Sequence, residues 1–377
     1  MERLRLDHVD GMRAVAALVV FLNHAYFQTW CYFYERFPPA PFAFLSHWLA
    51  IGHLAVSVFI VISGFCLYLP LTRSEGVLRG GAMPFLRRRA RRILPPYFAA
   101  LALSLVLIAT IIGEQTGSPW DASARVRGID IASHVLLLQN VFGTGRINYA
   151  FWSIALEWQI YFLFPLIAVL LVRIGPLATV LASLALGYSF TLSSVPRLDH
   201  ANFHYLGLFA LGMAAARICY MGSPEAVRRF PWPAVTAAHL LTATALVFYW
   251  DWRTAIAHWP MLDLIVGFGT AALLITAARS PAGLVTRAFS FPPLVSVGRF
   301  SYSLYLIHAP LLQVLWLYAL KPLGIGDAAI YVALVLGGLP LILAASYAFF
   351  RAFEEPFMGQ ASGGRKQGRE TPTHVSQ

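Results

Sequence analysis

Charged residues are scarce in this sequence. Only 12% of its 377 residues are Asp, Glu, Lys or Arg, against roughly 25% in an average soluble domain. A water-soluble fold of this length cannot cover its surface with so few charges. The composition therefore excludes an ordinary soluble globular protein.

Cysteine is nearly absent as well. Cys31, Cys66 and Cys219 are too few and too scattered for a disulfide framework, and no CxxC or Cys/His spacing indicates zinc. The sequence also lacks an internal repeat of roughly 20 to 50 residues. We therefore expect no metal site, no redox chemistry and no repeat architecture.

Apolar residues are what the sequence has in abundance, at 58% with a mean hydropathy of +0.66. A helix needs about 20 apolar residues to cross a bilayer, and ten runs approach or reach that length. The first run follows Arg3 and Arg5 as a signal peptide would, but it contains Arg13 and His24 and lacks a cleavage site, so we expect a retained helix. The predicted fold is an all-α integral membrane bundle of about ten transmembrane helices. The predicted spans are residues 12–31, 49–71, 93–113, 150–172, 176–192, 203–221, 233–250, 260–278, 301–320 and 328–350.

Basic residues lie unevenly between these spans. If both termini are cytoplasmic, the inner side holds 21 Lys and Arg residues and the outer side seven, which is the asymmetry that membrane insertion favours. The net charge of +11 does not predict nucleic-acid binding, because these cations collect in loops between apolar runs. We expect a multi-pass protein of the cell membrane with cytoplasmic termini.

Two segments stand apart from the spans. Residues 114–149, here called the outer segment, contain an apolar stretch too short to cross a bilayer. We expect a lid or a re-entrant piece there, with a role in acceptor selectivity. Residues 1–357 would form one transmembrane domain, and residues 358–377 a polar, disordered cytoplasmic tail.

Ionisable residues within the spans are functional candidates, because burying them in hydrocarbon is unfavourable. Arg13 and His24 lie eleven residues apart on the first span, about three turns and nearly on one face. Glu157 lies at a depth similar to that of His24. A His–carboxylate pair suits acyl transfer to a hydroxyl, with the imidazole as base and the carboxylate orienting it. The alternative is a structural pair that joins two helices, together with Asn23.

Other polar groups have equally open interpretations. His308 on the ninth span follows Ser and Tyr residues at helical spacing, which favours helix packing. The cluster Arg87, Arg88, Arg89, Arg91 and Arg92 suits a phosphate-bearing donor. Anionic lipid and the insertion bias explain the same cluster without any ligand. Trp152, Trp158 and Tyr161 are typical of aromatic residues at a membrane interface, and Glu354-Glu355-Pro356 of a helix that ends before proline.

Five segments, taken in order, resemble the acyltransferase-3 family of membrane O-acyltransferases. Residues 6–25 contain Asp10-Gly11-Met12-Arg13 and then His24, similar to the family's Asp-Gly-x-Arg start and its Arg-x10-His pairing. Residues 57–65 end in Ser63-Gly64-Phe65, and residues 88–95 resemble the arginine-rich entry to the third span. Residues 151–159 resemble the Trp-Ser-x-x-x-Glu segment, although Trp158 stands where a second acid is common. Residues 298–308 match the ninth-span motif. The resemblance covers nearly the whole chain.

This resemblance implies a donor, a chemistry and a set of site residues. The donor would be cytoplasmic acyl-CoA, usually acetyl-CoA, as co-substrate and without a metal. His24, Glu157 and Arg13 would be catalytic, and Arg89, Arg92, Ser63, Tyr302 and His308 would bind the donor. The extra periplasmic hydrolase-like domain of some members is not expected here.

The acceptor is left open by the sequence. A cell-surface polysaccharide, a lipid-linked sugar and a glycosylated metabolite all fit a hydroxyl acceptor, and the oligomeric state is not indicated. The alternative function is a proton-coupled transporter or flippase, with Arg13, His24 and Glu157 as its path.

Overall fold

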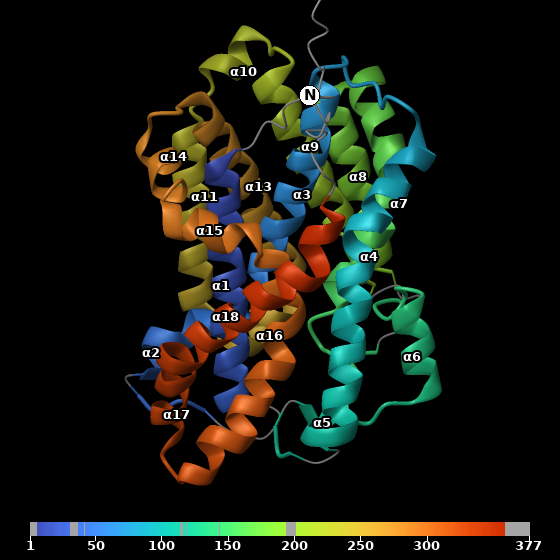
Figure 1. Ribbon diagram of the computed structural model, residues 1–377. Coiled ribbons are helices and arrows are strands. Elements are labelled where there is room, and N and C mark those ends of the chain that lie inside the picture. Colours follow the sequence, from blue (N-terminus) through green and yellow to red (C-terminus); the bar gives the residue numbers. More distant parts are fainter. Residues whose placement is uncertain are drawn as a thin grey trace, which may run out of the picture.

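A computed structural model of the chain describes residues 6–30, 37–40, 42–113, 116–118, 120–142, 144–193 and 201–358. Within these ranges every regular element is a helix, as the sequence predicts (Figure 1). Arg3, Arg5 and residues 359–377 of the predicted tail lie outside the described residues.

Long helices correspond to all ten predicted spans. They are α1 (Asp7–Thr29), α3 (Leu54–Thr72), α4 (Ala82–Leu107), α7 (Trp152–Arg173), α8 (Gly175–Thr191), α9 (Tyr205–Tyr220), α11 (Trp232–Tyr249), α13 (Trp259–Arg279), α16 (Ser301–Leu315), and α17 (Asp327–Ala333) continued by α18 (Leu339–Phe349). Shorter helices join them: α2 (Phe42–Ser46), α5 (Trp120–Ala124), α6 (Gly128–Val135), α10 (Glu225–Arg229), α12 (Trp252–Ala257), α14 (Leu284–Phe289) and α15 (Pro292–Arg299).

Seven helical stretches in the described ranges are long and apolar enough to cross a membrane. Helices α8 and α9 are apolar but shorter, and α1 carries Asp7, Asp10 and Arg13 near its start. The all-α membrane class is therefore confirmed. The number of crossings and the side of the termini stay predictions.

The last helical stretch is longer than its prediction. It runs from Asp327 to Phe357 through two π-helical turns, at Leu334–Gly338 and Phe350–Glu354. The prediction stopped at residue 350 because a charge follows. In the structure Arg351 pairs with Glu355 at 2.9 Å, one turn further on, and both side chains are exposed. An exposed pair of this kind is compatible with a continuing helix.

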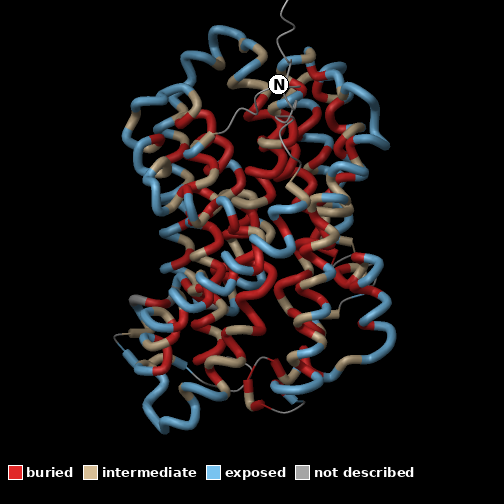
Figure 2. The backbone as a smooth tube through the Cα atoms, viewed as in Figure 1, coloured by how far each residue is buried: buried red, intermediate tan, exposed pale blue. Residues whose placement is uncertain are grey.

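Helix α9 lies in the middle of the bundle. Twelve of its 16 residues are buried, which explains why it is apolar on every side. The outer helices instead expose large apolar side chains, among them Leu177, Leu241 and Leu336, each at least 70% exposed. Figure 2 shows buried residues along the middle of the bundle and exposed residues along its periphery. An apolar perimeter around a closely packed interior is what hydrocarbon requires.

Glycines bring two pairs of helices into close contact. A Cβ atom added to Gly212 of α9 would lie 1.9 Å from the Val61 carbonyl oxygen of α3, and one added to Gly64 would lie 2.1 Å from that of Phe209. The same holds where α1 meets α14 and α15, at Gly11 and Gly298. Small residues allow this approach of backbones in membrane helices.

The connecting elements gather at the two ends of the bundle. Helices α10 and α14 lie at the same end as the start of α1, and α2, α5 and α17 lie at the opposite end (Figure 1). This grouping is the one that alternate crossing of the bundle would produce. It assigns neither end to the cytoplasm by itself.

Candidate active site

Two histidines from distant parts of the chain meet inside the bundle. His24 of α1 and His308 of α16 lie with Nδ1 of the first 2.6 Å from Nε2 of the second. Their rings are parallel, with centroids 4.9 Å apart. His308 is buried and His24 is half-buried. The structure therefore pairs His24 with a residue 284 positions further along the chain.

The carbonyl groups around His308 fix which nitrogens carry protons. Nδ1 of His308 lies 3.0 Å from the carbonyl oxygen of Leu304 and 2.8 Å from that of Tyr305. A carbonyl oxygen only accepts, so Nδ1 of His308 donates and Nε2 of a neutral His308 must accept. His24 then donates from Nδ1 to His308. This leaves a lone pair on Nε2 of His24, and no hydrogen bond from the described residues occupies that atom.

Aromatic packing orients the His24 ring further. Tyr149, at the end of the outer segment, lies edge-on to it, with centroids 4.8 Å apart, and Trp120 of α5 packs against Tyr149 at 5.5 Å. The neighbouring Asn23 amide donates to the carbonyl of Leu49 and so joins α1 to the segment before α3. A base held in this way needs little reorganisation before it accepts a proton.

Glu157 is not the partner of His24, which corrects the predicted pairing. Its carboxylate accepts hydrogen bonds from Ser63 Oγ at 2.6 Å and from Tyr161 Oη at 2.5 Å. The prediction compared depths within two spans, and depth does not determine which face of a helix a side chain occupies. Ser63 of α3 thus contacts a predicted catalytic residue. Tyr161 is buried within the bundle and is not on its exposed perimeter, where aromatic residues of a membrane interface are expected.

The arginines predicted to bind the donor differ in burial. Arg89 and Arg92 of α4 are half-buried, whereas Arg87, Arg88 and Arg91 are exposed. The Arg89 guanidinium lies over the Phe85 ring, 6.0 Å from its centroid. The Arg-x-x-Arg pair therefore occupies the inward side of α4, as helical spacing allows.

Arg13 and Tyr302 have defined neighbours. Arg13 forms an ion pair with Asp10 at 3.5 Å, one turn earlier on α1. Tyr302 of α16 donates to the Ile93 carbonyl oxygen at 3.1 Å and so links α16 to α4. The hydroxyl of Tyr302 thus has a structural contact within the bundle.

Two buried acids are not predicted as site residues by the sequence. Glu354 accepts a 2.5 Å hydrogen bond from Ser303 and is buried, although its sequence context indicates only the end of a helix. Asp263 of α13 accepts from Ser57 and from Nε2 of His204, the latter at 2.9 Å. Asp263 lies inside an apolar run and Glu354 follows the end of one. An acid at such a position is unfavourable in hydrocarbon unless it has a partner, and this could have marked both residues as candidates.

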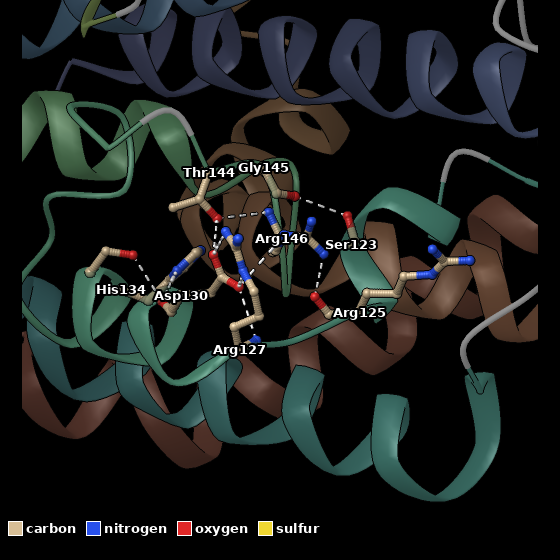
Figure 3. Close-up of polar contacts among 9 residues, drawn as sticks. Ser123, Arg125, Arg127, Asp130, His134, Thr144, Gly145 and Arg146 are labelled. Atoms are coloured by element: carbon tan, nitrogen blue, oxygen red, sulfur yellow. Dashed lines mark hydrogen bonds and ion pairs between the residues drawn. The ribbon is translucent and has the colours of Figure 1, made fainter. Parts of the chain in front are cut away.

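A buried carboxylate organises the outer segment. Asp130 of α6 accepts hydrogen bonds from the backbone and side chain of Arg127 and from Thr144 Oγ1 at 2.9 Å, and its oxygen lies 3.6 Å from Nε of Arg146 (Figure 3). Burial acts to raise the pKa of this carboxyl, but the hydrogen bonds from Arg127 and Thr144 outweigh it and lower the pKa below its ordinary value. The carboxylate therefore stays ionised and connects Arg127 in the middle of the segment to Thr144 and Arg146 near its end.

A helical bundle with an apolar perimeter, an inward arginine pair and two histidines in contact inside it has the features of a multi-pass membrane protein. A comparison with protein families identifies the family to which this membrane protein belongs. The chain belongs to the family described as Acyltransferase domain, whose model matches residues 6–351. The family resemblance inferred from the sequence motifs is thereby confirmed.

Individual relatives are distant. A Staphylococcus aureus (strain COL) protein named "Putative O-acetyltransferase" is 25% identical over 384 residues, covering 93% of this chain and 56% of that protein. The peptidoglycan O-acetyltransferase OatA of Listeria monocytogenes is 24% identical over 338 residues, covering 82% of this chain and 50% of that protein. The chain thus spans about half the length of the curated relatives it matches. No solved structure matches it.

Proposed function

We propose that this chain is a membrane O-acetyltransferase that moves an acetyl group from cytoplasmic acetyl-CoA to a hydroxyl of a carbohydrate acceptor. The observation that carries the proposal is the Nε2 atom of His24, which keeps a lone pair because Nδ1 donates to His308 and which accepts no hydrogen bond from the described residues. Family membership and relatives named as O-acetyltransferases support the acyl chemistry. The acceptor would be a surface polysaccharide such as peptidoglycan, a lipid-linked sugar or a glycosylated metabolite at the cell membrane.

In the proposed reaction, Nε2 of His24 takes the proton of the acceptor hydroxyl. The hydroxyl oxygen attacks the thioester carbonyl carbon and forms the new C–O bond, and the C–S bond breaks. The leaving CoA thiolate takes the proton back from His24. The products are an acetyl ester and free CoA. His308 acts as a positioning residue, because it fixes the tautomer of His24 and touches no reacting atom.

The donor is proposed to approach from the end of the bundle where α4 begins. Arg89 and Arg92 would bind the CoA phosphates with guanidinium groups, which suit phosphate oxygens. Arg13 lies eleven residues before His24 on α1, roughly 16 Å of helical rise. The pantetheine arm would extend along that distance, so that the thioester ends near His24. Glu157 is proposed to lie beside the pantetheine arm, near Arg13, as an acid of the catalytic site. Ser63 and Tyr161 hold its carboxylate there by hydrogen bonds.

The experiment follows acetyl transfer from labelled acetyl-CoA by detergent-purified protein. His24→Ala should lower the rate at least about 100-fold, the usual contribution of a general base. His239→Ala is the matched control, because His239 is another half-buried histidine on a long helix, α11, where its Nδ1 bonds to the Val235 carbonyl. Wild-type activity in His24→Ala would contradict the proposal.

The same assay tests the donor site. Arg92→Gln should raise the KM for acetyl-CoA about tenfold or more, since a charge-assisted contact to phosphate is lost. Arg91→Gln, at the exposed neighbouring position, should leave that KM unchanged. Equal KM values for the two variants would remove Arg92 from the proposed donor site.

A further inference from the structure

A polar cavity lies between the outer segment and the start of α7. Its volume is about 120 Å³, well above the space of a single water molecule. Three amides, a hydroxyl, two aromatic rings and a glycine line it: Gln139, Asn140, Asn148, Thr144, Tyr149, Trp152 and Gly145. None of these side chains is charged, so the lining suits a neutral polar ligand.

Tyr149 connects this cavity to the proposed catalytic base. Tyr149 lines the cavity, and its ring also lies edge-on to His24, with centroids 4.8 Å apart. One residue is therefore common to the cavity and to the surroundings of His24. This proximity links the cavity to the site where the acceptor hydroxyl must lose its proton.

One of the lining residues, Gln139, has a buried side-chain oxygen without a hydrogen bond from the described residues. Gln139 is 1% exposed, and its Nε2 donates to the Phe151 carbonyl at 2.9 Å and to Tyr97 Oη at 3.3 Å. Its Oε1 has no partner among the described residues. A buried acceptor without a donor is unfavourable, and a ligand hydroxyl would satisfy it.

We propose that this cavity is the acceptor subsite and that it takes a neutral sugar ring. Gln139 Oε1 would accept a hydrogen bond from one ring hydroxyl, and the half-buried Trp152 would pack its indole against the apolar face of the ring. A second hydroxyl of the same sugar, or one on the adjoining sugar, would reach Nε2 of His24. This inference rests on the proposed function, because it names the substrate class of that site.

The hydrogen bonds of the outer segment hold the cavity in shape. Thr144 in its lining donates to Asp130, and the carbonyl oxygen of Gly145 accepts from Ser123 Oγ at 3.0 Å (Figure 3). Hydrogen bonds to Asp130 and Ser123 therefore hold the lining residues Thr144 and Gly145 in place. A preformed site of this kind favours selectivity between acceptors.

Gly145 offers a way to fill the cavity without disturbing the fold. A Cβ atom added there meets no atom within 4 Å, and its backbone does not require glycine. Gly145→Leu should therefore occupy space that a sugar needs. Gly128→Leu is the matched control, because Gly128 is equally unobstructed, belongs to the same outer segment and does not line the cavity.

The assay uses detergent-purified full-length chain, acetyl-CoA and four probes. The para-nitrophenyl glycosides of glucose, galactose and N-acetylglucosamine are the neutral acceptors, and the glucuronide is the anionic counterpart of the glucoside. We expect acetylation of at least one neutral glycoside, with kcat/KM for the glucuronide at least tenfold below that for the glucoside. Gly145→Leu should raise the glycoside KM at least tenfold and leave the KM for acetyl-CoA unchanged, and Gly128→Leu should behave as wild type.

Several outcomes would overturn the inference. One is an unchanged glycoside KM in Gly145→Leu, and another is a glucuronide acetylated as well as the glucoside. Consumption of acetyl-CoA without acetylation of any glycoside would also overturn it, while the acyltransferase proposal stands. If the wild-type chain neither consumes acetyl-CoA nor acetylates any probe, the proposed function itself fails.

Discussion

At the scale of single residues, the sequence indicated candidate positions but could not predict which residues contact them. Arg13, His24 and Glu157 were selected because ionisable groups at membrane depth are unfavourable unless they serve a purpose. The partner of His24 is His308, 284 positions away, and periodicity on one helix carries no information about the facing side of another. The motif glycines Gly11 and Gly298 have a packing role at the contact of α1 with α14 and α15.

The imidazole pair makes a prediction about His308. His308→Leu removes the acceptor for Nδ1–H of His24 and should lower kcat about 100-fold, with an unchanged KM for acetyl-CoA. His308→Gln keeps an amide oxygen that can accept the same hydrogen bond, so it should retain more activity than His308→Leu. Steady-state kinetics of the two variants check this, and a wild-type kcat in His308→Leu would contradict the positioning role.

At the scale of elements, apolar runs predicted where long helices occur but not how they end or touch. The runs omit the short helices α2, α5, α6 and α10, each of which is too short to signal a span by itself. The continuous stretch from Asp327 to Phe357 passes a charged residue that the prediction used as an end. The contact of α3 with α9 depends on backbone approach at glycines, which hydropathy does not report.

The contact between α3 and α9 is open to a direct test. Gly212→Ala places a methyl group 1.9 Å from the Val61 carbonyl oxygen, so the helices must move apart, at about 1–3 kcal/mol for an overpacked site. We expect a fall of several degrees in the thermal midpoint of the detergent-solubilised protein. In contrast, Gly337→Ala meets no atom within 4 Å on an exposed helical position and should not lower the midpoint. Equal midpoints for the two variants would show that the contact tolerates a side chain.

At the scale of the whole molecule, composition was sufficient to predict an all-α membrane bundle. The reason is physical, because hydrocarbon leaves a chain few ways to satisfy its backbone. Orientation depends instead on the distribution of charge, 21 basic residues predicted on one side and seven on the other. The arrangement of α10 and α14 against α2, α5 and α17 is compatible with that distribution (Figure 1).

Cysteine labelling tests the predicted orientation. In a parent whose Cys31, Cys66 and Cys219 are replaced by serine, Ala122→Cys on α5 and Ala226→Cys on α10 introduce single exposed thiols at opposite ends of the bundle. With cytoplasmic termini, a membrane-impermeant maleimide should label the first on intact cells. It should label the second only after the cells are permeabilised. The reverse pattern would invert the orientation and place the proposed donor site outside.

The anchoring of His308 has a consequence for the cell that carries this protein. The chain of hydrogen bonds that starts at Nε2 of His24 passes through His308 and ends at two main-chain carbonyl oxygens. Those oxygens accept a hydrogen bond but cannot relay a proton further. Through this pair, a proton can leave His24 only by the nitrogen on which it arrived. The imidazole pair therefore provides no route by which protons could cross the membrane, even while His24 accepts and returns a proton during acetyl transfer.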